Sequence, residues 1–118
     1  MGTIKVAIIP ADETKRVEFK EIENTLPEFQ KIVDGYIEAV RLRDNEQSVA
    51  LDYYCNEEFL YREDLLPNMR ATALYILSFN TTNLIGGDVV CVGGVDAHGN
   101  TKGLDAKQEA HLRKLFDF

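Results

Sequence analysis

One apolar run in the chain combines β-branched residues with a glycine pair at each end: Ile-Gly-Gly-Asp-Val-Val-Cys-Val-Gly-Gly, residues 85–94. A continuous apolar run of this kind is typical of a strand that is buried on both faces. We therefore predict Asp88 to Val92 as the central strand of a sheet. Helical patterns at Asn68 to Phe79 and at Asp105 to Phe116 are expected to cover its two faces.

Three segments carry the start patterns of helices. Thr25-Leu26-Pro27-Glu28 is a capping box with proline in the first turn, and Gly35 stands where a left-handed C-terminal cap belongs. Asn68 is expected to cap the second helix. Asp105 and Gln108 match a weaker capping box at the third. The second helix has an apolar stripe at helical spacing, made of Met69, Ala73, Ile76 and Leu77.

Alternating apolar and polar residues predict the other strands. Thr3 to Ile9 is the first strand, and the alternation from Val17 to Ile22 suggests its hairpin return. Phe59 to Tyr61 is a candidate short strand. Asp96 to Asn100 has the composition of a turn, with Gly99 where a positive φ is needed. The fold expected from these elements is α+β, with a small, mostly antiparallel sheet and about three helices.

Two further runs, residues 36–43 and 48–55, are expected to form a hairpin around a four-residue turn at 44–47. With Arg43 opposite Ser48, the apolar residues of both strands lie on one face. A slip of one residue would turn the whole apolar set outward, which supports the pairing.

In this register Glu38 lies opposite Tyr53 on the apolar face. A buried carboxylate requires a partner or a raised pKa, and the Tyr53 hydroxyl is a suitable donor. In the alternative interpretation, Glu38 lies at the edge of the sheet with its carboxylate in water.

The chain has 118 residues, of which 45% are apolar, so we expect a single domain over residues 1–118. Thirteen Lys and Arg against twenty Asp and Glu give a net charge of −7, which disfavours binding to duplex nucleic acid. A few clustered arginines can still hold a small anion. No apolar run is long enough to span a membrane, and the N-terminus has no signal-peptide core, so a cytoplasmic location is expected.

The sequence patterns of common metal and catalytic sites are missing. Cys55 and Cys91 lie in apolar strand contexts, which favours two buried thiols over a disulfide. His98 and His111 have no Cys or His at metal-ligand spacing, and both are expected on the surface. The glycine pairs lack a dinucleotide or phosphate-loop fingerprint and are interpreted as strand-end turns, bulges or close contacts. We therefore expect no metal, no cofactor and no catalytic residue.

Arg70 lies in the first turn of the expected second helix, where the backbone amides and the helix dipole favour anions. One reason that would favour a cation here is that Arg70 and the helix amides share an anionic ligand or a carboxylate such as Glu38, Glu57 or Glu58. Two interpretations stay open: an internal salt bridge with Asn68 as an ordinary cap, or an anion site at Asn68 and Arg70.

Several short blocks of the chain occur in the same order in a known family. With them the chain resembles the uncharacterised domain of unknown function three-eight-four-six, which is found in phages, other mobile elements and their bacterial hosts. The resemblance extends from about Ile4 to Leu104, and the chain departs from the family pattern in a longer linker at 59–64 and in the doubled Gly93-Gly94. Because the family has no assigned reaction, the resemblance implies only a phage-like origin and action inside a bacterial cell. The blocks are Gly35-Tyr36-Ile37-Glu38-Ala39-Val40, Cys55-Asn56-Glu57-Glu58, Leu66-Pro67-Asn68 with Ala71-Thr72, and Gly87-Asp88-Val89-Val90 with Val92-Gly93.

The polar residues of these blocks are also those that the pattern does not explain as ordinary surface. A strand, the corner that follows the next strand and a helix start would place them around one end of the sheet. The expected ligand-binding residues are Glu38, Tyr53, Asn56, Glu57, Asn68, Arg70 and Thr72.

We expect a non-enzymatic domain that binds a small ligand, anionic or a nucleotide, or a host protein, and that forms a homo-oligomer through its edge strands. A phage protein of this kind would sequester a nucleotide signal or block a host defence protein. One alternative is a small enzyme with Glu38 or Glu57 as general base and Arg70 as anion clamp. Another is a purely structural accessory protein.

Overall fold

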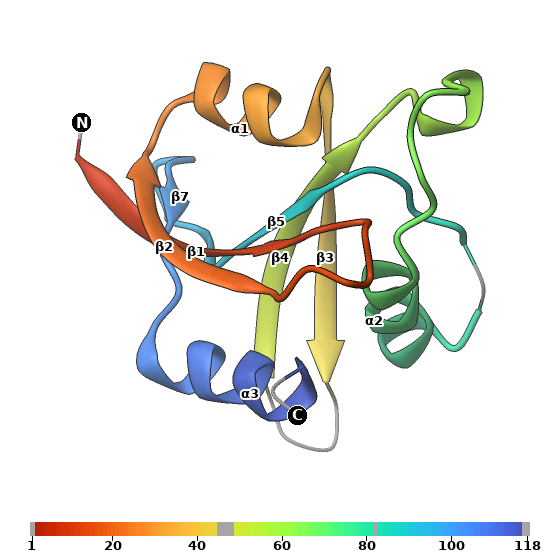
Figure 1. Cartoon of the computed structure of the whole chain (residues 1–118). Coiled ribbons are helices and arrows are strands. Elements are labelled where there is room, and N and C mark those ends of the chain that lie inside the picture. The colour runs from red at the N-terminus through yellow and green to blue at the C-terminus, as the bar shows by residue number, and fades with distance from the viewer. Residues whose placement is uncertain (1, 45–48, 82, 117–118) are drawn as a thin grey trace.

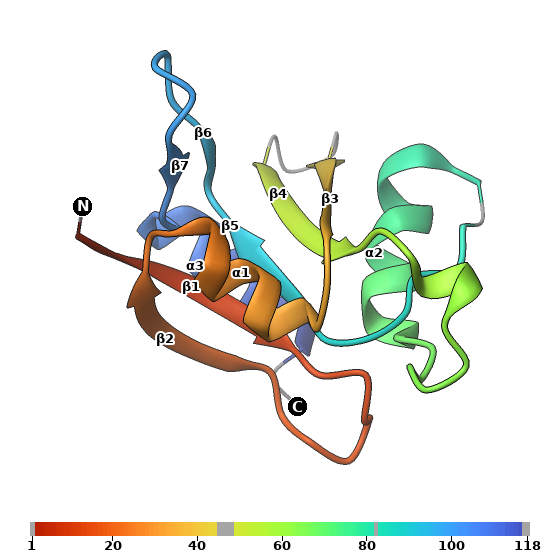
Figure 2. The ribbon, with the colours of Figure 1, turned by 90° about the horizontal axis from the view of Figure 1, so that it is seen from above.

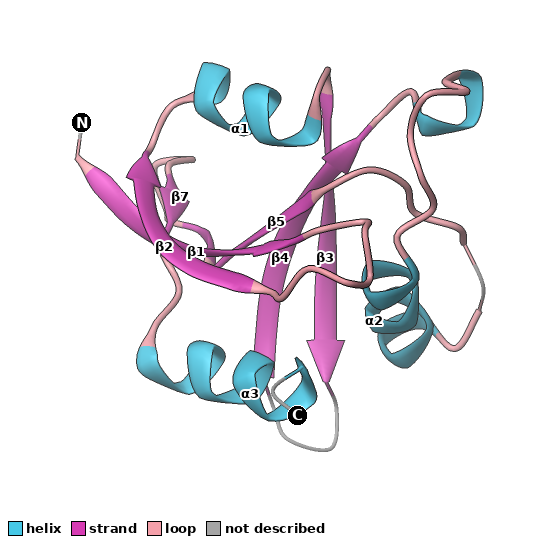
Figure 3. Cartoon of the chain, in the orientation of Figure 1, coloured by secondary structure: helices cyan, strands magenta, loops and turns pink. Residues whose placement is uncertain are grey.

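A computed structural model of the chain describes residues 2–44, 49–81 and 83–116. In this part of the chain, three α-helices accompany a five-stranded antiparallel sheet and a two-stranded one (Figure 1, Figure 3), which confirms the predicted α+β class. In chain order the elements are β1 (Thr3–Ile9), β2 (Glu18–Glu23), α1 (Leu26–Val33), β3 (Ile37–Asp44), β4 (Val49–Asn56), the 3₁₀ turn η1 (Phe59–Tyr61), α2 (Met69–Phe79), β5 (Val89–Val92), β6 (Gly94–Val95), β7 (Thr101–Lys102) and α3 (Ala106–Phe116).

The predicted central strand is the middle strand of the larger sheet. The strand order is β2-β1-β5-β4-β3, and Cys91 of β5 lies between Ala7 of β1 and Tyr53 of β4. All residues of β5 are buried, and its side chains alternate between two apolar clusters, one on each face of the sheet. The sequence-based prediction of this strand is therefore confirmed.

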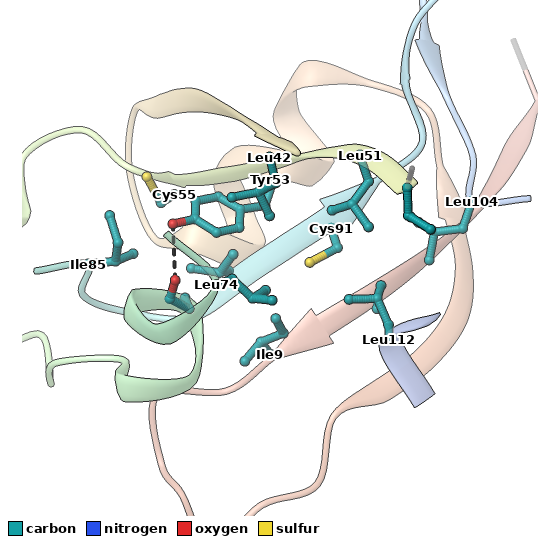
Figure 4. Packing of buried hydrophobic residues seen from close by; sticks show 14 residues of the cluster. Ile9, Leu42, Leu51, Tyr53, Cys55, Leu74, Ile85, Cys91, Leu104 and Leu112 are labelled. Atoms are coloured by element: carbon teal, nitrogen blue, oxygen red, sulfur yellow. Dashed lines mark hydrogen bonds between the residues drawn. The ribbon is translucent and has the colours of Figure 1, made fainter. Parts of the chain in front are cut away.

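The helices cover the two faces in a different way from the one predicted. α1 packs on one face through Phe29 and Val33, whereas α2 and α3 both lie on the opposite face, where Leu74 and Leu112 enter the larger cluster (Figure 2, Figure 4). The prediction that α2 and α3 cover opposite faces is wrong. An apolar stripe indicates which side of a helix is buried, but it does not indicate on which face of a sheet the helix lies.

The β3–β4 hairpin has a different register from the predicted one. Arg43 lies opposite Ala50, and Glu38 lies opposite Cys55, so the strands are aligned two residues away from the prediction. A shift of two residues keeps every side chain on its face, so hydrophobic alternation does not reveal it. The turn predicted at 44–47 lies, apart from residue 44, outside the described residues.

The predicted helix starts are confirmed, and one helix end differs. The Asn68 side chain accepts a hydrogen bond from a first-turn amide of α2, and Asp105 and Gln108 bond each other's backbone amides at 2.8 and 2.9 Å. At the end of α1 the left-handed residue is Asp34, with φ 63°, instead of Gly35. The helix ends one residue earlier than expected because aspartate tolerates this conformation better than most residues.

The short segment Phe59–Tyr61 is a 3₁₀ turn and not the predicted strand. Three residues are too few for alternation to distinguish the two. The Phe59 ring packs directly on Gly86, where a Cβ atom would overlap the ring, so this glycine is a close contact as expected. The turn between β6 and β7 has Gly99 at φ 84°, in agreement with the prediction.

α2 is rotated so that its predicted apolar stripe is exposed, although Leu77 also lines a pocket with Leu42 and Leu51 of the sheet. The side that packs on the sheet has Ala71, Thr72 and Leu74 buried, and Tyr75 packs against the same cluster while partly exposed. The exposed stripe residues are Met69, Ala73, Ile76 and Leu77, and the buried residues are Ala71, Thr72 and Leu74. α2 is apolar on both sides, so the sequence contained two candidate stripes, and the bulkier one is not the buried one.

Candidate functional site

The predicted ligand-binding residues are divided between two pockets and the protein interior. Glu38, Asn56 and Glu57 line a pocket of about 230 Å³ beside the start of β3 and the end of β4. Glu38 is exposed, as the edge-strand interpretation expected, because β3 is the last strand of the sheet. Its predicted pairing with Tyr53 is wrong, since Cys55 occupies the opposite position.

Tyr53 is fully buried and connects the sheet to α2. Its hydroxyl donates a hydrogen bond of 3.2 Å to the carbonyl of Ala71 (Figure 4). Burial raises the pKa of this phenol far above its usual value, with smaller contributions from neighbouring groups, so it stays protonated. Tyr53 therefore holds α2 against the sheet and is not on the lining of either pocket.

Asn68 is also fully buried, and its side chain is occupied by the fold. Its amide nitrogen donates to the carbonyls of Ile9 and Gly87 at 2.8 and 2.9 Å, and its oxygen accepts from the Ala71 amide at 3.0 Å. Both amide hydrogens and the capping oxygen are thus used. The hydroxyl of Thr72 donates to the Asn68 carbonyl and accepts from the amide of Ile85.

Asn56 lines the first pocket but also acts as an internal connector. Its amide nitrogen donates to the carbonyls of Val33 and Asp34, each at 3.1 Å, and its oxygen accepts from the Glu58 amide at 2.7 Å. These bonds attach the end of α1 to the end of β4. Asn56, Asn68 and Thr72 are therefore explained by junctions between elements.

Arg70 lies in the second pocket and does not meet Glu38 or Glu57 there. Its Nη2 donates to the carbonyls of Pro10 and Asp12 at 2.7 and 3.2 Å, which attaches the β1–β2 loop to the first turn of α2. Its Nε is buried and has no hydrogen-bond partner among the residues that the structure describes. The internal salt bridge considered for Arg70 is therefore not the contact found, because the residue binds backbone carbonyls.

The second pocket, which we call the basic pocket, has a volume of about 250 Å³ and lies between the β1–β2 loop, β2, α2 and α3. Four of its side chains are cationic and one is anionic, a formal charge of +3 in a chain of net charge −7. The apolar part of the lining contains two phenylalanines. Its residues are Glu13, Thr14, Lys15, Arg16, Val17, Phe19, Arg70, Arg113 and Phe116.

The cations of the basic pocket differ in how far they are already paired. Arg113 forms an ion pair of 2.8 Å with Glu109 and stacks 4.1 Å above the Phe19 ring. Lys15 and Arg16 are exposed and form no ion pair within the described part of the chain. These two residues therefore carry the charge that is most available to a ligand.

Sequence reasoning found Arg70 but missed the other cations. Lys15 and Arg16 follow a turn, whereas Arg113 lies almost a hundred residues later on α3, so no spacing pattern joins them. The available indication was an adjacent Lys-Arg pair between the first two predicted strands of an acidic chain. The folding of α3 beside β2 is what brings the three together.

The groups required by the enzymatic alternative are not assembled. Glu38 and Glu57 line the pocket that does not contain Arg70. Cys55 lines that same pocket, but burial raises its pKa to about 12, so its thiol is protonated at neutral pH. In the described part of the chain, no group of three or more His, Cys, Asp or Glu side chains is placed to hold a metal ion.

Both cysteines are free and buried, as predicted. His98 is exposed in its turn, but His111 is buried, which corrects the expectation of a surface position. His111 lies on the side of α3 that contacts the sheet, next to Leu112. It is buried because of its position around the helix axis, although its side chain is polar. Among the described residues, no helix is long and apolar enough to cross a membrane.

Comparison with known proteins identifies one family. No curated protein and no solved structure matches the chain. The family model described as Domain of unknown function (DUF3846) matches residues 4–117, nearly the whole chain. The chain therefore belongs to this family of unknown function, in agreement with the resemblance seen in its short sequence blocks.

Proposed function

We propose that the protein is a non-enzymatic binding domain whose ligand is a small anion held in the basic pocket. The observation that carries this proposal is the concentration of Lys15, Arg16, Arg70 and Arg113 around one pocket of an otherwise acidic chain. Cations gathered against the net charge of a protein repel one another and gain stability from a bound anion.

The lining also suggests the class of anion. Guanidinium groups recognise phosphate and carboxylate groups through paired hydrogen bonds, and two of the cationic residues with exposed side chains, Arg16 and Arg113, carry this group. Val17, Phe19 and Phe116 offer apolar contact to a ring or short chain on the same ligand. A volume of about 250 Å³ lies just below the usual range of ligand pockets, which favours a compact ligand. A mononucleotide or a smaller phosphorylated compound fits these features.

The phage origin that the resemblance implies suggests a biological role for this binding. A domain that holds a nucleotide without transforming it would lower the free concentration of a host signal, which is a form of counter-defence inside the bacterial cell. The basic pocket contains one carboxylate, the exposed Glu13, and the carboxylates considered as a general base line the other pocket. A sequestering role requires no general base.

The first test is a native mass spectrum of freshly purified protein, followed by calorimetric titration with inorganic phosphate and with adenosine 5′-monophosphate at low salt. The variant is Lys15→Gln with Arg16→Gln, because both side chains are exposed and form no ion pair with the residues that the structure describes. The matched control is Lys31→Gln with Lys107→Gln, which makes the same change of charge at exposed positions outside the pocket.

We expect a copurifying anion or measurable binding of a probe, and a loss of about tenfold or more in affinity for the pocket variant alone, which corresponds to about 1.4 kcal/mol. Chromatography of the incubated nucleotide should return it unchanged. The proposal is wrong if the protein carries no anion and binds neither probe, or if both double variants lose affinity equally. Conversion of the nucleotide would favour the enzymatic alternative.

A further inference from the structure

α2 presents an apolar stripe to the outside of the molecule. The stripe residues Met69, Ile76 and Leu77 are 50, 40 and 71% exposed, and Ala73 lies among them on the same side of the helix. Their spacing of three and four residues places them in one row. Figures 1 and 2 show α2 at one end of the sheet. We call this row the outer stripe.

A helix at a protein surface normally carries charged residues on its outer side. α2 has a single charged residue, Arg70, and that side chain is turned toward the carbonyls of Pro10 and Asp12. The opposite side of the helix is already packed, since Ala71 and Leu74 are buried in the larger cluster. α2 is therefore apolar on two sides, which is typical of a helix that is covered on both.

The residues beside the outer stripe enlarge the apolar surface. The chain segment that returns after α2 runs along the helix, because the amide of Ile85 donates to Thr72 Oγ1 and its carbonyl accepts from the Asn68 amide. Leu84 precedes this segment and Leu66 precedes the helix, and both are exposed. We use the name outer patch for the outer stripe together with these two leucines: Leu66, Met69, Ala73, Ile76, Leu77 and Leu84. Leu84 also lines the pocket that contains Glu38 and Glu57.

The size of the outer patch is that of an interface core. With on the order of 100 Å² for a fully exposed side chain of this kind, the measured exposures amount to roughly 300 Å² of apolar surface. A patch of this size is comparable with the largest one that a typical monomeric protein exposes, and such patches are often functional. A standard interface removes about 800 Å² from each partner, and its apolar core is surrounded by a polar rim.

We propose that the outer patch is covered by a second copy of this chain, in a homodimer whose two-fold axis passes close to Ala73. Two copies that each carry a charge of −7 repel one another, so a contact between them has to exclude charge, and none of the six patch residues is charged. A two-fold axis places the same residues of the two copies against each other. An uncharged apolar row can pack against its own copy in this way, whereas a charged row would meet its own charge.

The shape of the row also suits an antiparallel crossing of two α2 helices. The small side chain of Ala73 lies between Met69 and Leu77, each four residues away. At a crossing centred on Ala73, the bulky residues of one copy lie beside the alanine of the other, and the helix backbones approach closely. Addition of β3 to another sheet is less favourable, because the Ser78 hydroxyl of α2 already accepts a hydrogen bond from the Arg43 amide of this edge strand.

The test is the oligomeric state of the full chain, measured by sedimentation velocity and native mass spectrometry up to about 100 μM, where contacts of micromolar affinity are formed. The variant is Ala73→Glu, which removes no packing from the fold and brings two carboxylates together at the axis. The matched control is Ala110→Glu, at an exposed alanine of α3. Circular dichroism melting checks that both variants fold.

We expect a dimer for the wild type and for Ala73→Glu a dissociation constant raised about tenfold or more, with Ala110→Glu unchanged. Under mild oxidation, Ala73→Cys should form a disulfide-linked dimer more readily than Ala110→Cys, and the native cysteines do not interfere because both are buried. A monomeric wild type, or a dimer that Ala73→Glu leaves intact, overturns the proposal. None of these results depends on whether the basic pocket binds an anion.

Discussion

Asn68 shows how one buried side chain joins three parts of the fold. Its amide holds the end of β1 and the Gly87 loop, while its oxygen caps α2. The sequence indicated only the cap, because a helix N-cap is a local pattern. The two other bonds link residues far apart along the chain, at Ile9 and Gly87.

We predict that Asn68→Ala destabilises the protein by about 3–5 kcal/mol. The substitution leaves two buried carbonyls without a donor and removes the helix cap, which leaves the Ala71 amide unpaired, at about 1–3 kcal/mol for each such group before relaxation. Urea unfolding followed by circular dichroism gives the free energy of unfolding. Asn83→Ala, at an exposed asparagine, is the control and should change it by less than about 0.5 kcal/mol. A loss below about 1 kcal/mol for Asn68→Ala would show that water replaces the missing amide.

The difference between local patterns and contacts that are distant along the chain also explains which part of the candidate site was predictable. Asn56, Asn68 and Thr72 were selected as polar residues of the family blocks that the pattern did not explain as ordinary surface, and their explanation is structural. Arg70 was noticed because a cation opposes the helix dipole. Lys15 and Arg113 were missed because solvated charges on a loop and a helix have no local feature that indicates a shared pocket.

At the scale of elements, the sequence predicted the strands and helices better than their arrangement. Capping boxes and alternation are local patterns, and they gave the helix starts and the central strand correctly. The β3–β4 register and the faces covered by α2 and α3 depend on contacts between elements. A two-residue shift of the hairpin keeps the apolar side chains on the same face of the sheet. A half-turn rotation of α2 still places apolar residues, Ala71 and Leu74, in the core.

Arg62 connects two elements by charge. It binds both carboxylate oxygens of Asp64 at 2.6 and 2.7 Å, and it reaches the side chain and the carbonyl of Asp34 at the end of α1, each at 3.0 Å. The Arg62 guanidinium lowers the pKa of Asp64 from 3.8 to about 2. The ion pair therefore contributes stability that is present above pH 4 and is lost as the pH falls toward 2.

We predict that Arg62→Gln lowers the thermal unfolding midpoint slightly at pH 6, and that the difference from the wild type shrinks between about pH 4 and pH 2. The effect is small because the carboxylates are exposed and solvent screens the pair. Differential scanning calorimetry across this pH range measures it. Arg41→Gln is a poor control because Arg41 pairs with the buried Asp52. The control is therefore Arg16→Gln, at an arginine that forms no ion pair with the described residues. A difference that stays constant down to pH 2 would contradict the assignment to Asp64.

At the scale of the whole molecule, charge is distributed unevenly. The net charge is −7, the basic pocket carries +3, and the outer patch carries none. The two proposed contacts therefore have electrostatic contributions of opposite sign. The anion is attracted to its pocket, whereas two copies of the chain repel each other as they meet.

We predict that added salt changes the two equilibria in opposite directions. Between about 0.02 and about 0.3 M sodium chloride the screening length falls from about 20 Å to about 6 Å, so both attraction and repulsion weaken. Binding of adenosine 5′-monophosphate should become severalfold weaker in calorimetry, while sedimentation should show a dimer that is severalfold tighter. Potassium glutamate in place of sodium chloride controls for chloride bound in the pocket. If both equilibria weaken together with salt, charged contacts hold the copies together, and the dimer interface lies somewhere other than the uncharged face of α2.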